Sequence, residues 1–150
     1  MTHAHDTPSS MTLDIVSAEG AIWSGRARMV SLRAIGGELG ILPRHAALVT
    51  LLQPGTVRIT TLDNDEECIY VSGGMLEVQP HVVTVLADTA LRSTQIDEQA
   101  ALAAKRHAEE MMRDSVLFID RDAAHIELMQ AMAQLAVLEH ARRRRKPSGR

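Results

Sequence analysis

The chain has 150 residues, a hydrophobic fraction of 45% and a formal net charge of −3, which suits a folded protein and argues against a general polyanion binder. Its aromatic residues, Trp23, Tyr70 and Phe118, are too few for a base-stacking platform, and the single cysteine, Cys68, excludes an internal disulfide. No segment approaches the ~20 apolar residues of a membrane-spanning helix, so we expect any membrane association to be indirect.

Residues 1–10 lack the basic start and apolar run of a secretory signal, and we expect them to be a flexible extension. A β domain is predicted over residues 11–90. Eight of the nine glycines lie between Gly20 and Gly74, and apolar residues alternate with polar ones in segments of strand length. These segments include residues 13–15, 30–34, 56–60, 68–72 and 82–87. Short strands with frequent turns are typical of a β-sandwich or a flattened barrel.

A helical hairpin is predicted over residues 91–143, followed by a basic flexible tail over residues 144–150. Between Ala90 and Ala141 there are twelve alanines and no glycine or proline, which favours helix. One apolar stripe consists of Ile96, Ala100, Ala104, Ala108 and Met111, and a second consists of Ala124, Leu128, Ala131, Leu135 and Leu138. Asp120 is a suitable N-cap for the second helix. The fold class is therefore α+β, with an antiparallel two-helix hairpin after the β domain.

The glycine-rich segment at residues 36–40 resembles a phosphate-binding loop only superficially. No Lys-Ser or Lys-Thr pair follows it, and Pro43 interrupts any helix whose N-terminus would hold phosphate. Gly73 and Gly74 are equally weak as a nucleotide signature, because a strand bend or turn explains them. The glycines therefore indicate turns, and the sequence predicts no cofactor site.

The cysteine and the histidines also lack a convincing catalytic or metal-binding pattern. A lone cysteine in an apolar strand usually packs in a core, so we do not expect Cys68 to act as a nucleophile with His45 or His81. His3 and His5 have no further ligands at metal-binding spacing. The sequence thus predicts neither a catalytic residue nor a metal site, and the chain is not expected to be an enzyme.

Three segments carry a family resemblance: residues 37–46 (GELGILPRHA), 71–78 (VSGGMLEV) and 83–90 (VTVLADTA). In this order and spacing they resemble the epsilon subunit of bacterial F-type ATP synthases, over roughly residues 11–141. The resemblance implies a non-catalytic rotor subunit in which a β-sandwich docks on the gamma subunit and on the c-ring. It also implies that the C-terminal hairpin can extend into the alpha/beta ring and inhibit ATP hydrolysis. The expected location is the cytoplasmic face of the bacterial inner membrane, held there by the complex.

The resemblance also assigns an interface role to Glu38 and His45. In the family, the matching residues face the polar loops of the c-ring. Gly37 and Gly40 would let the backbone turn sharply there, and Pro43 would fix the loop. Without the resemblance, Glu38 and His45 would be interpreted as exposed loop residues.

Some family members bind ATP in the folded hairpin through a signature that this chain keeps only in part. Ile96 and Asp97 match the signature, but its arginine is replaced by Ala100. The supporting arginines fall on His107, Gln130 and Gln134. A polyphosphate needs fixed cations and forked donors, so we expect no high-affinity ATP binding.

The C-terminal basic run consists of Arg142, Arg143, Arg144, Arg145 and Lys146. Three interpretations stay open. The run is a solvated helix end that complements the helix dipole, an arm for nucleic acid or anionic lipid, or a regulatory tail that meets the acidic beta-subunit motif implied by the family. A nucleic-acid-binding module is the alternative function, but the net acidity and the few aromatic residues oppose it, so no nucleic-acid partner is expected.

Overall fold

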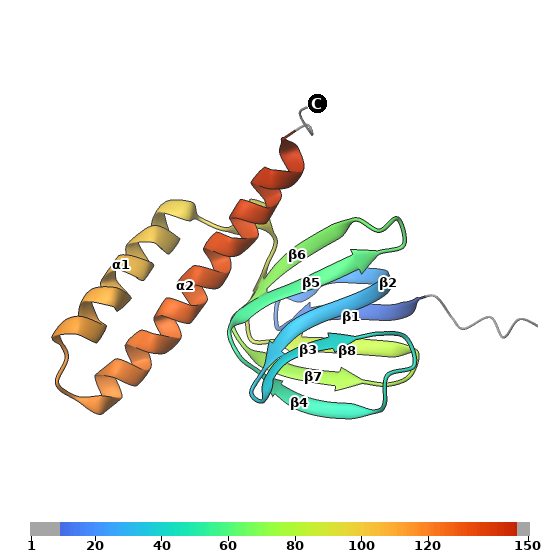
Figure 1. The fold of residues 1–150 in the computed structure, drawn as a ribbon, viewed down its shortest axis with the longest axis horizontal. Coiled ribbons are helices and arrows are strands. Elements are labelled where there is room, and N and C mark those ends of the chain that lie inside the picture. The colour runs from blue at the N-terminus through green and yellow to red at the C-terminus, as the bar shows by residue number, and fades with distance from the viewer. Residues whose placement is uncertain (1–9, 147–150) are drawn as a thin grey trace, which may run out of the picture.

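The computed structural model describes residues 10–146, which form a β domain followed by a helical hairpin (Figure 1). The strands are β1 (Met11–Ser17), β2 (Gly20–Ala34), β3 (Gly37–Ile41), β4 (Leu48–Leu52), β5 (Gly55–Thr61), β6 (Glu66–Val71), β7 (Gly74–Val78), β8 (Val82–Ala87) and β9 (Ala90–Leu91). A short 3-10 helix, η1 (Ser93–Gln95), leads into α1 (Glu98–Asp114) and α2 (Phe118–Arg145). The predicted α+β class is confirmed. The predicted extension at residues 1–10 and the end of the predicted tail lie largely outside the described residues.

The strands are hydrogen-bonded in the order β1-β8-β7-β4-β2-β5-β6-β9, with β3 added to β2 and β1 paired back onto β2. β1 and β8 pair in parallel, although β2 to β7 lie between them in the sequence. The β2–β4 junction consists of a single residue pair, Ala34 opposite Leu52. Because this junction is so short, the strands form a flattened β-sandwich and not a true barrel.

The sandwich core is built from aliphatic side chains, as the low aromatic content predicts. Alternate residues of each strand point inward, so that Leu13, Ile15, Val30, Ile59 and Leu76 are completely buried. Among the described residues no polar or charged side chain is classed as buried. The two layers are therefore held together mainly by the hydrophobic effect.

Gly74, at the start of β7, has a structural requirement for glycine. Its φ of 135° lies where L side chains are rarely found, and a Cβ atom there would lie 2.1 Å from the Leu86 carbonyl oxygen of β8. Gly74, the second glycine of the Gly73-Gly74 pair in the family resemblance, is thus explained by the close approach of two strand backbones.

The helix boundaries differ from the sequence prediction at both ends of α2. Asp97 caps α1, since its side chain accepts a hydrogen bond from the Ala100 amide at 3.1 Å. α2 begins at Phe118 with Leu117 in the cap position, so the prediction that Asp120 is the N-cap is wrong, and Asp120 lies in the first turn. The helix also continues through Arg145, which makes Arg144 and Arg145 helical although a flexible tail was expected from residue 144.

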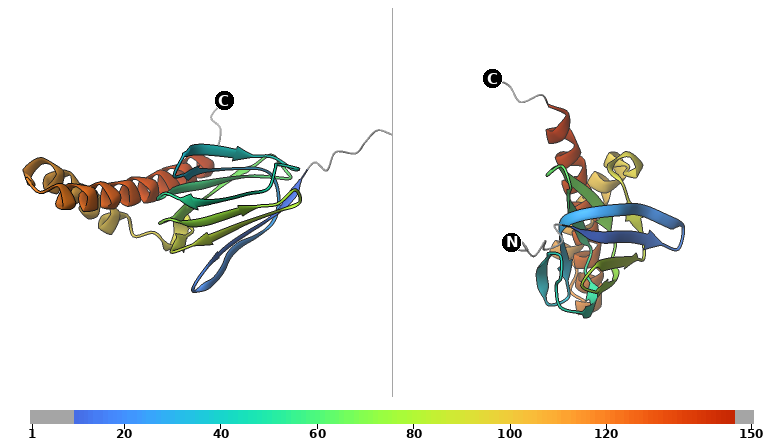
Figure 2. Two further views of the ribbon diagram at one scale, coloured as in Figure 1. Left: turned by 90° about the horizontal axis from the view of Figure 1, so that it is seen from below. Right: turned by 90° about the vertical axis from the view of Figure 1, so that its right-hand side faces the viewer.

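α2 lies between α1 and the sandwich, as the views in Figures 1 and 2 show together. The helix–helix seam buries Ala101 and Ala108 of α1 against Ala124 and Ala131 of α2. Ala100, predicted in the seam, is exposed. Ile96, also predicted there, precedes α1 and packs against the sandwich side of α2 instead. No helix in the described part of the chain has the length and hydropathy of a membrane span.

Candidate functional site

The surface between α2 and the sandwich combines apolar and polar side chains. α2 contacts β5 and β6. Its apolar contact has four buried residues, Tyr70, Ile96, Ala133 and Val137, and the partly buried Cys68, Leu91 and Leu138 pack against them. Tyr70 is 2% exposed, and this burial raises the pKa of its hydroxyl, while a hydrogen bond with Gln134 acts in the opposite direction. Apolar burial contributes ~25 cal/mol per Å², so a cluster of this size holds the hairpin by a modest free energy.

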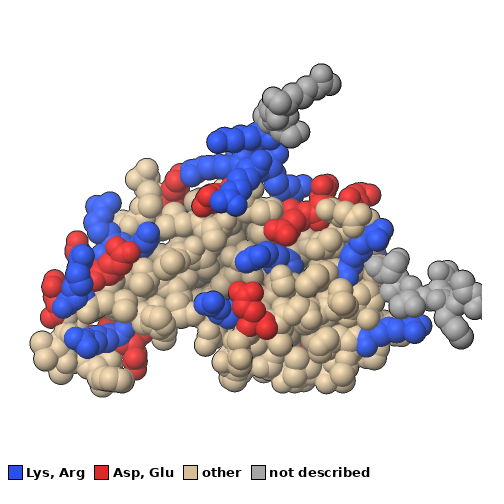
Figure 3. Space-filling model, viewed as in Figure 1, with Lys and Arg blue, Asp and Glu red and all other residues tan. Residues whose placement is uncertain are grey.

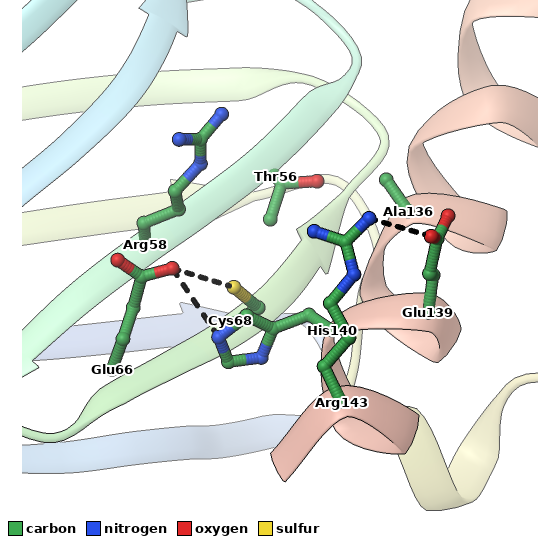
Figure 4. A pocket seen from close by; sticks show the side chains of 8 residues that line it. All are labelled: Thr56, Arg58, Glu66, Cys68, Ala136, Glu139, His140 and Arg143. Carbon is green, nitrogen blue, oxygen red and sulfur yellow. Dashed lines mark hydrogen bonds and ion pairs between the residues drawn. The ribbon is translucent and has the colours of Figure 1, made fainter. Parts of the chain in front are cut away.

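A hollow of about 290 Å³ lies beside that cluster, between β6 and the last turns of α2 (Figure 4). It is lined by Thr56, Arg58, Glu66, Cys68, Ala136, Glu139, His140 and Arg143. The His140 Nε2 atom lies 3.2 Å from Glu66 Oε1, and the Cys68 thiol donates toward the same oxygen at 4.0 Å. The hollow therefore brings together an imidazole, a carboxylate and a thiol.

The Cys68 thiol is a weak nucleophile in this environment. Burial and the neighbouring Glu66 raise its pKa to about 11, against a smaller lowering effect of Arg58 and Arg144. The thiol is thus protonated at neutral pH. His45 and His81 were the histidines considered as partners of Cys68 in the sequence, and neither lines this hollow. The histidine that lines it is His140.

The basic end of α2 is paired with carboxylates on three sides, and Figure 3 shows its cluster of basic side chains at the end of the helix, with acidic ones beside it. Arg142 pairs with Glu98 of α1, and the Arg143 guanidinium lies 2.7 Å from Glu139 within α2. Arg144 Nη2 lies 3.9 Å from Asp65 Oδ2, in the turn between β5 and β6. These pairs were not predicted from the sequence. The acidic residues from Asp63 to Glu67 were the available signal, because they are of opposite charge to the arginines.

Glu38 and His45, predicted together at one interface, lie near opposite ends of β3. Glu38 is exposed at the start of the strand, where it faces Arg33 of β2 in register and lines a hollow of about 220 Å³ with Met129 and Met132 of α2. His45 is half-buried in the loop after β3, with its Nδ1 2.8 Å from the Ala46 carbonyl oxygen. Glu38 therefore lies beside the hairpin, and His45 does not line that hollow.

One outer face of the sandwich is unusually apolar. Leu51, Met75 and Leu86 lie directly opposite one another across β4, β7 and β8 and are 52%, 41% and 48% exposed. Together with Ile35 and Ile126 they line an open groove of about 630 Å³. A contiguous exposed patch of this kind marks an interaction surface.

Comparison with known proteins covers both parts of the chain. The family model "ATP synthase, Delta/Epsilon chain, beta-sandwich domain" matches residues 10–93, and the "long alpha-helix domain" of the same chain type matches residues 94–139. A protein of Halorhodospira halophila called "ATP synthase epsilon chain" is 53% identical over 92% of this chain and 99% of its own length. One of the same name from Nitrosospira multiformis is 50% identical over 88% of this chain and 95% of its own length.

Solved structures show the same fold. A chain in the Euglena gracilis mitochondrial ATP synthase (OSCP/F1/c-ring) matches with a TM-score of 0.75 at 21% identity, over 92% of this chain and 87% of that one. A chain of the Tetrahymena thermophila mitochondrial ATP synthase central stalk/c-ring matches with a TM-score of 0.55 at 12% identity, over 85% and 96%. The resemblance found in the three sequence segments is confirmed: with matches over both domains and half of its residues shared with full-length relatives, this chain belongs to the delta/epsilon chain family of ATP synthases.

Proposed function

We propose that this chain is a non-catalytic central-stalk subunit that joins the gamma subunit to the c-ring of an F-type ATP synthase and restrains ATP hydrolysis through its hairpin. The observation that carries the proposal is the 53% identity, over 92% of this chain, to a protein called ATP synthase epsilon chain. In this role the chain works at the cytoplasmic face of the bacterial inner membrane, held there by its partners.

The apolar outer face is the best surface for a permanent partner, and we assign it to the gamma subunit. Leu51, Met75 and Leu86 form a continuous row over three strands, and no charged side chain interrupts it. Obligate interfaces resemble a protein core divided in two and are apolar. A rotor contact that must transmit torque without slipping requires such a surface.

Glu38 and His45 remain our proposal for the c-ring contact. They lie at different ends of β3, so one short loop of a partner cannot reach both. The c-ring would present several copies of the same polar loop, so Glu38 and His45 would contact two neighbouring loops. The hairpin would also affect how accessible Glu38 is to the c-ring, since Glu38 lines the same hollow as Met129 and Met132 of α2.

Two features support a hairpin that leaves the sandwich. Its apolar attachment is the small cluster around Tyr70. Its tip presents four large apolar side chains to solvent, Val116, Leu117, Phe118 and Ile119, with exposures from 66% to 94%. Exposed apolar groups favour a partner that covers them, and the alpha/beta ring would do so when the hairpin extends. A two-state equilibrium of this kind responds to any partner with different affinities for the two states.

The basic run has a double role in this proposal. In the docked hairpin, Arg142 and Arg144 pair with Glu98 and Asp65 of the chain itself. In the extended hairpin, Arg142, Arg143, Arg144, Arg145 and Lys146 would face the acidic motif of the beta subunit. On extension, the basic run would therefore exchange the carboxylates of Glu98 and Asp65 for those of the beta subunit. The same pairing weakens the alternative of a nucleic-acid-binding module, because a phosphate backbone would have to displace these carboxylates.

Crosslinking in an assembled complex tests the proposal. Cys68 is replaced by serine, and single cysteines are placed at Glu38, His45 and Met75. We expect Met75→Cys to crosslink to gamma, and Glu38→Cys and His45→Cys to crosslink to subunit c. Exposed Asp63→Cys, on a turn assigned to neither partner, serves as the control. Absence of every crosslink in an intact, purified complex would contradict the proposed position.

A further inference from the structure

Three potential metal ligands of different chemistry meet where α2 touches the sandwich. Glu66 and Cys68 are two residues apart on β6, so their side chains leave the same face of the strand. His140 reaches them from α2 (Figure 4). The carboxylate oxygen, the sulfur and the imidazole nitrogen all lie within 4.8 Å of one another.

The spacing of these atoms suits a small tetrahedral ion. Zinc binds nitrogen and oxygen at ~2.0 Å and sulfur at ~2.3 Å, which places ligand atoms on neighbouring corners about 3.3–3.5 Å apart. The observed Glu66–His140 and Glu66–Cys68 separations are 3.2 Å and 4.0 Å. Small side-chain rotations would close the set around an ion, and the adjoining hollow of about 290 Å³ has room for a water molecule as the fourth ligand.

We propose that Glu66, Cys68 and His140 form a binding site for a divalent transition metal of the zinc type, which bridges α2 to β6. The mixture of sulfur, nitrogen and one oxygen favours such an ion over calcium or magnesium, which take oxygen ligands. The cysteine binds as thiolate, so each ion bound releases its proton to solvent. The sequence alone offered no metal site because His140 is far from the other two ligands along the chain.

The surrounding charges set the strength of the site. Arg58 lies opposite Cys68 in register on β5 and opposes a bound cation. Arg143 also lines the hollow, but its guanidinium is 2.7 Å from Glu139, and Arg144 is paired with Asp65. Two of the three neighbouring arginines are thus already compensated by carboxylates.

A metal at this site would favour the docked hairpin, because its ligands come from both sides of the interface. A ligand that binds one of two states stabilises that state in proportion to its concentration over its Kd. This consequence rests on the hairpin mobility put forward under Proposed function, whereas metal binding itself does not.

The test uses the purified full-length chain with Zn²⁺ and Co²⁺ as probes. Calorimetry with Zn²⁺ is expected to give one site per chain, and Co²⁺ is expected to show a thiolate-to-metal charge-transfer band. Cys68→Ser and His140→Gln should each weaken binding at least about tenfold, since even partners outside the first coordination shell are worth ~10–100-fold. Thermal melts of each variant verify that it is folded.

Two control variants separate this site from other histidines. His107→Gln removes an imidazole that lies 3.4 Å from Glu127 on the α1 side of the hairpin, and it should leave binding unchanged. A double variant of His3 and His5 to alanine should also retain binding. No binding by the folded chain, or binding that depends on His3 and His5 instead of Cys68 and His140, would overturn the site.

Hydrogen exchange examines the bridge separately. Zn²⁺ should slow amide exchange in the last turns of α2 in the unaltered chain and leave it unchanged in Cys68→Ser. Binding that needs Cys68 and His140 without slower exchange would leave the ligand set in place and contradict the expected effect of the metal on the position of the hairpin. In that case the proposed mobility of the hairpin, and not the ligand set, is at fault.

Discussion

Arg144 in the last turn of α2 lies with its Nη2 3.9 Å from Oδ2 of Asp65, in the turn that joins β5 to β6. One turn earlier, on the same face of the helix, His140 lies 3.2 Å from Glu66. The end of the hairpin therefore meets the sandwich through polar and ionic side chains, whereas its middle meets it through the apolar cluster around Tyr70. This division predicts that salt and single charge changes alter the position of the hairpin.

Asp65→Asn tests the docked half of this exchange. It removes the partner of Arg144 in the docked hairpin without touching the extended one, so extension becomes easier. Exposed pairs contribute ~0.2–1 kcal/mol, and we expect ATP hydrolysis by the reconstituted F1 complex to slow by a few-fold at most. Asp63→Asn, in the same turn, is the matched control. An equal effect of both variants, or one that persists when Arg144 is also replaced by glutamine, would argue against the pair.

Deletion of residues 142–150 tests the extended half. The deletion removes the basic run from both states, and we expect the loss of the beta-subunit contact to dominate because more arginines take part in it. Hydrolysis should be faster than with the full chain at low salt, and the difference should shrink as salt rises. Added salt weakens the attraction between exposed charges, and at physiological ionic strength charges more than ~8 Å apart are largely screened. Equal rates at low salt, with the truncated chain still bound, would leave the run as a solvated helix end.

Gly74→Ala is expected to destabilise the sandwich severely. The φ of 135° alone costs ~1–3 kcal/mol for a side chain, and the 2.1 Å approach to the Leu86 carbonyl oxygen adds a clash with backbone that cannot move aside. Gly36→Ala is the control, because a Cβ atom there meets nothing within 4 Å. Urea unfolding followed by Trp23 fluorescence measures both variants. Similar midpoints for the two would show that β7 and β8 can separate without penalty.

The isolated chain is expected not to bind ATP at micromolar concentrations. Ala100 replaces the arginine of the signature, and Asp97 is occupied as the cap of α1. Calorimetry decides the point, and a Kd in the low micromolar range that Asp97→Asn abolishes would contradict it. Asparagine is the informative change because it retains the cap, whereas Asp97→Ala should cost about 1 kcal/mol of helix stability.

Cys68 is expected to resist alkylation until the solution is strongly basic. Its pKa of about 11 is raised mainly by burial, so the reactive thiolate is scarce at neutral pH and increases as the pH rises toward 11. In urea the thiol should titrate near its usual ~8.5. The rate of reaction with iodoacetamide as a function of pH measures both. A folded-state midpoint near 8.5 would mean that the hairpin does not cover Cys68 in solution.

Much of the fold could be predicted because it is encoded locally. The glycines up to Gly74 and the alanines from Ala90 onward divide the chain into strands and helices, and period-2 segments such as residues 82–87 match β8. The start of α2 was misplaced because Asp120 is a good cap by type, while the helix begins with the apolar residues Phe118 and Ile119. Cap preference is a weak local signal, and it fixes the start of a helix only to within one or two residues.

The sequence by itself determined the α+β class, the aliphatic core and the family, since composition, periodicity and the three family segments depend only on residues near one another in the chain. Only the tertiary structure decided which faces meet. It placed Glu38 beside α2 and away from His45, brought His140 to Glu66 and Cys68, and paired Arg144 with Asp65. Such contacts join segments that are distant in sequence. They depend on how α2 packs against β5 and β6, and no single segment of the sequence specifies that packing.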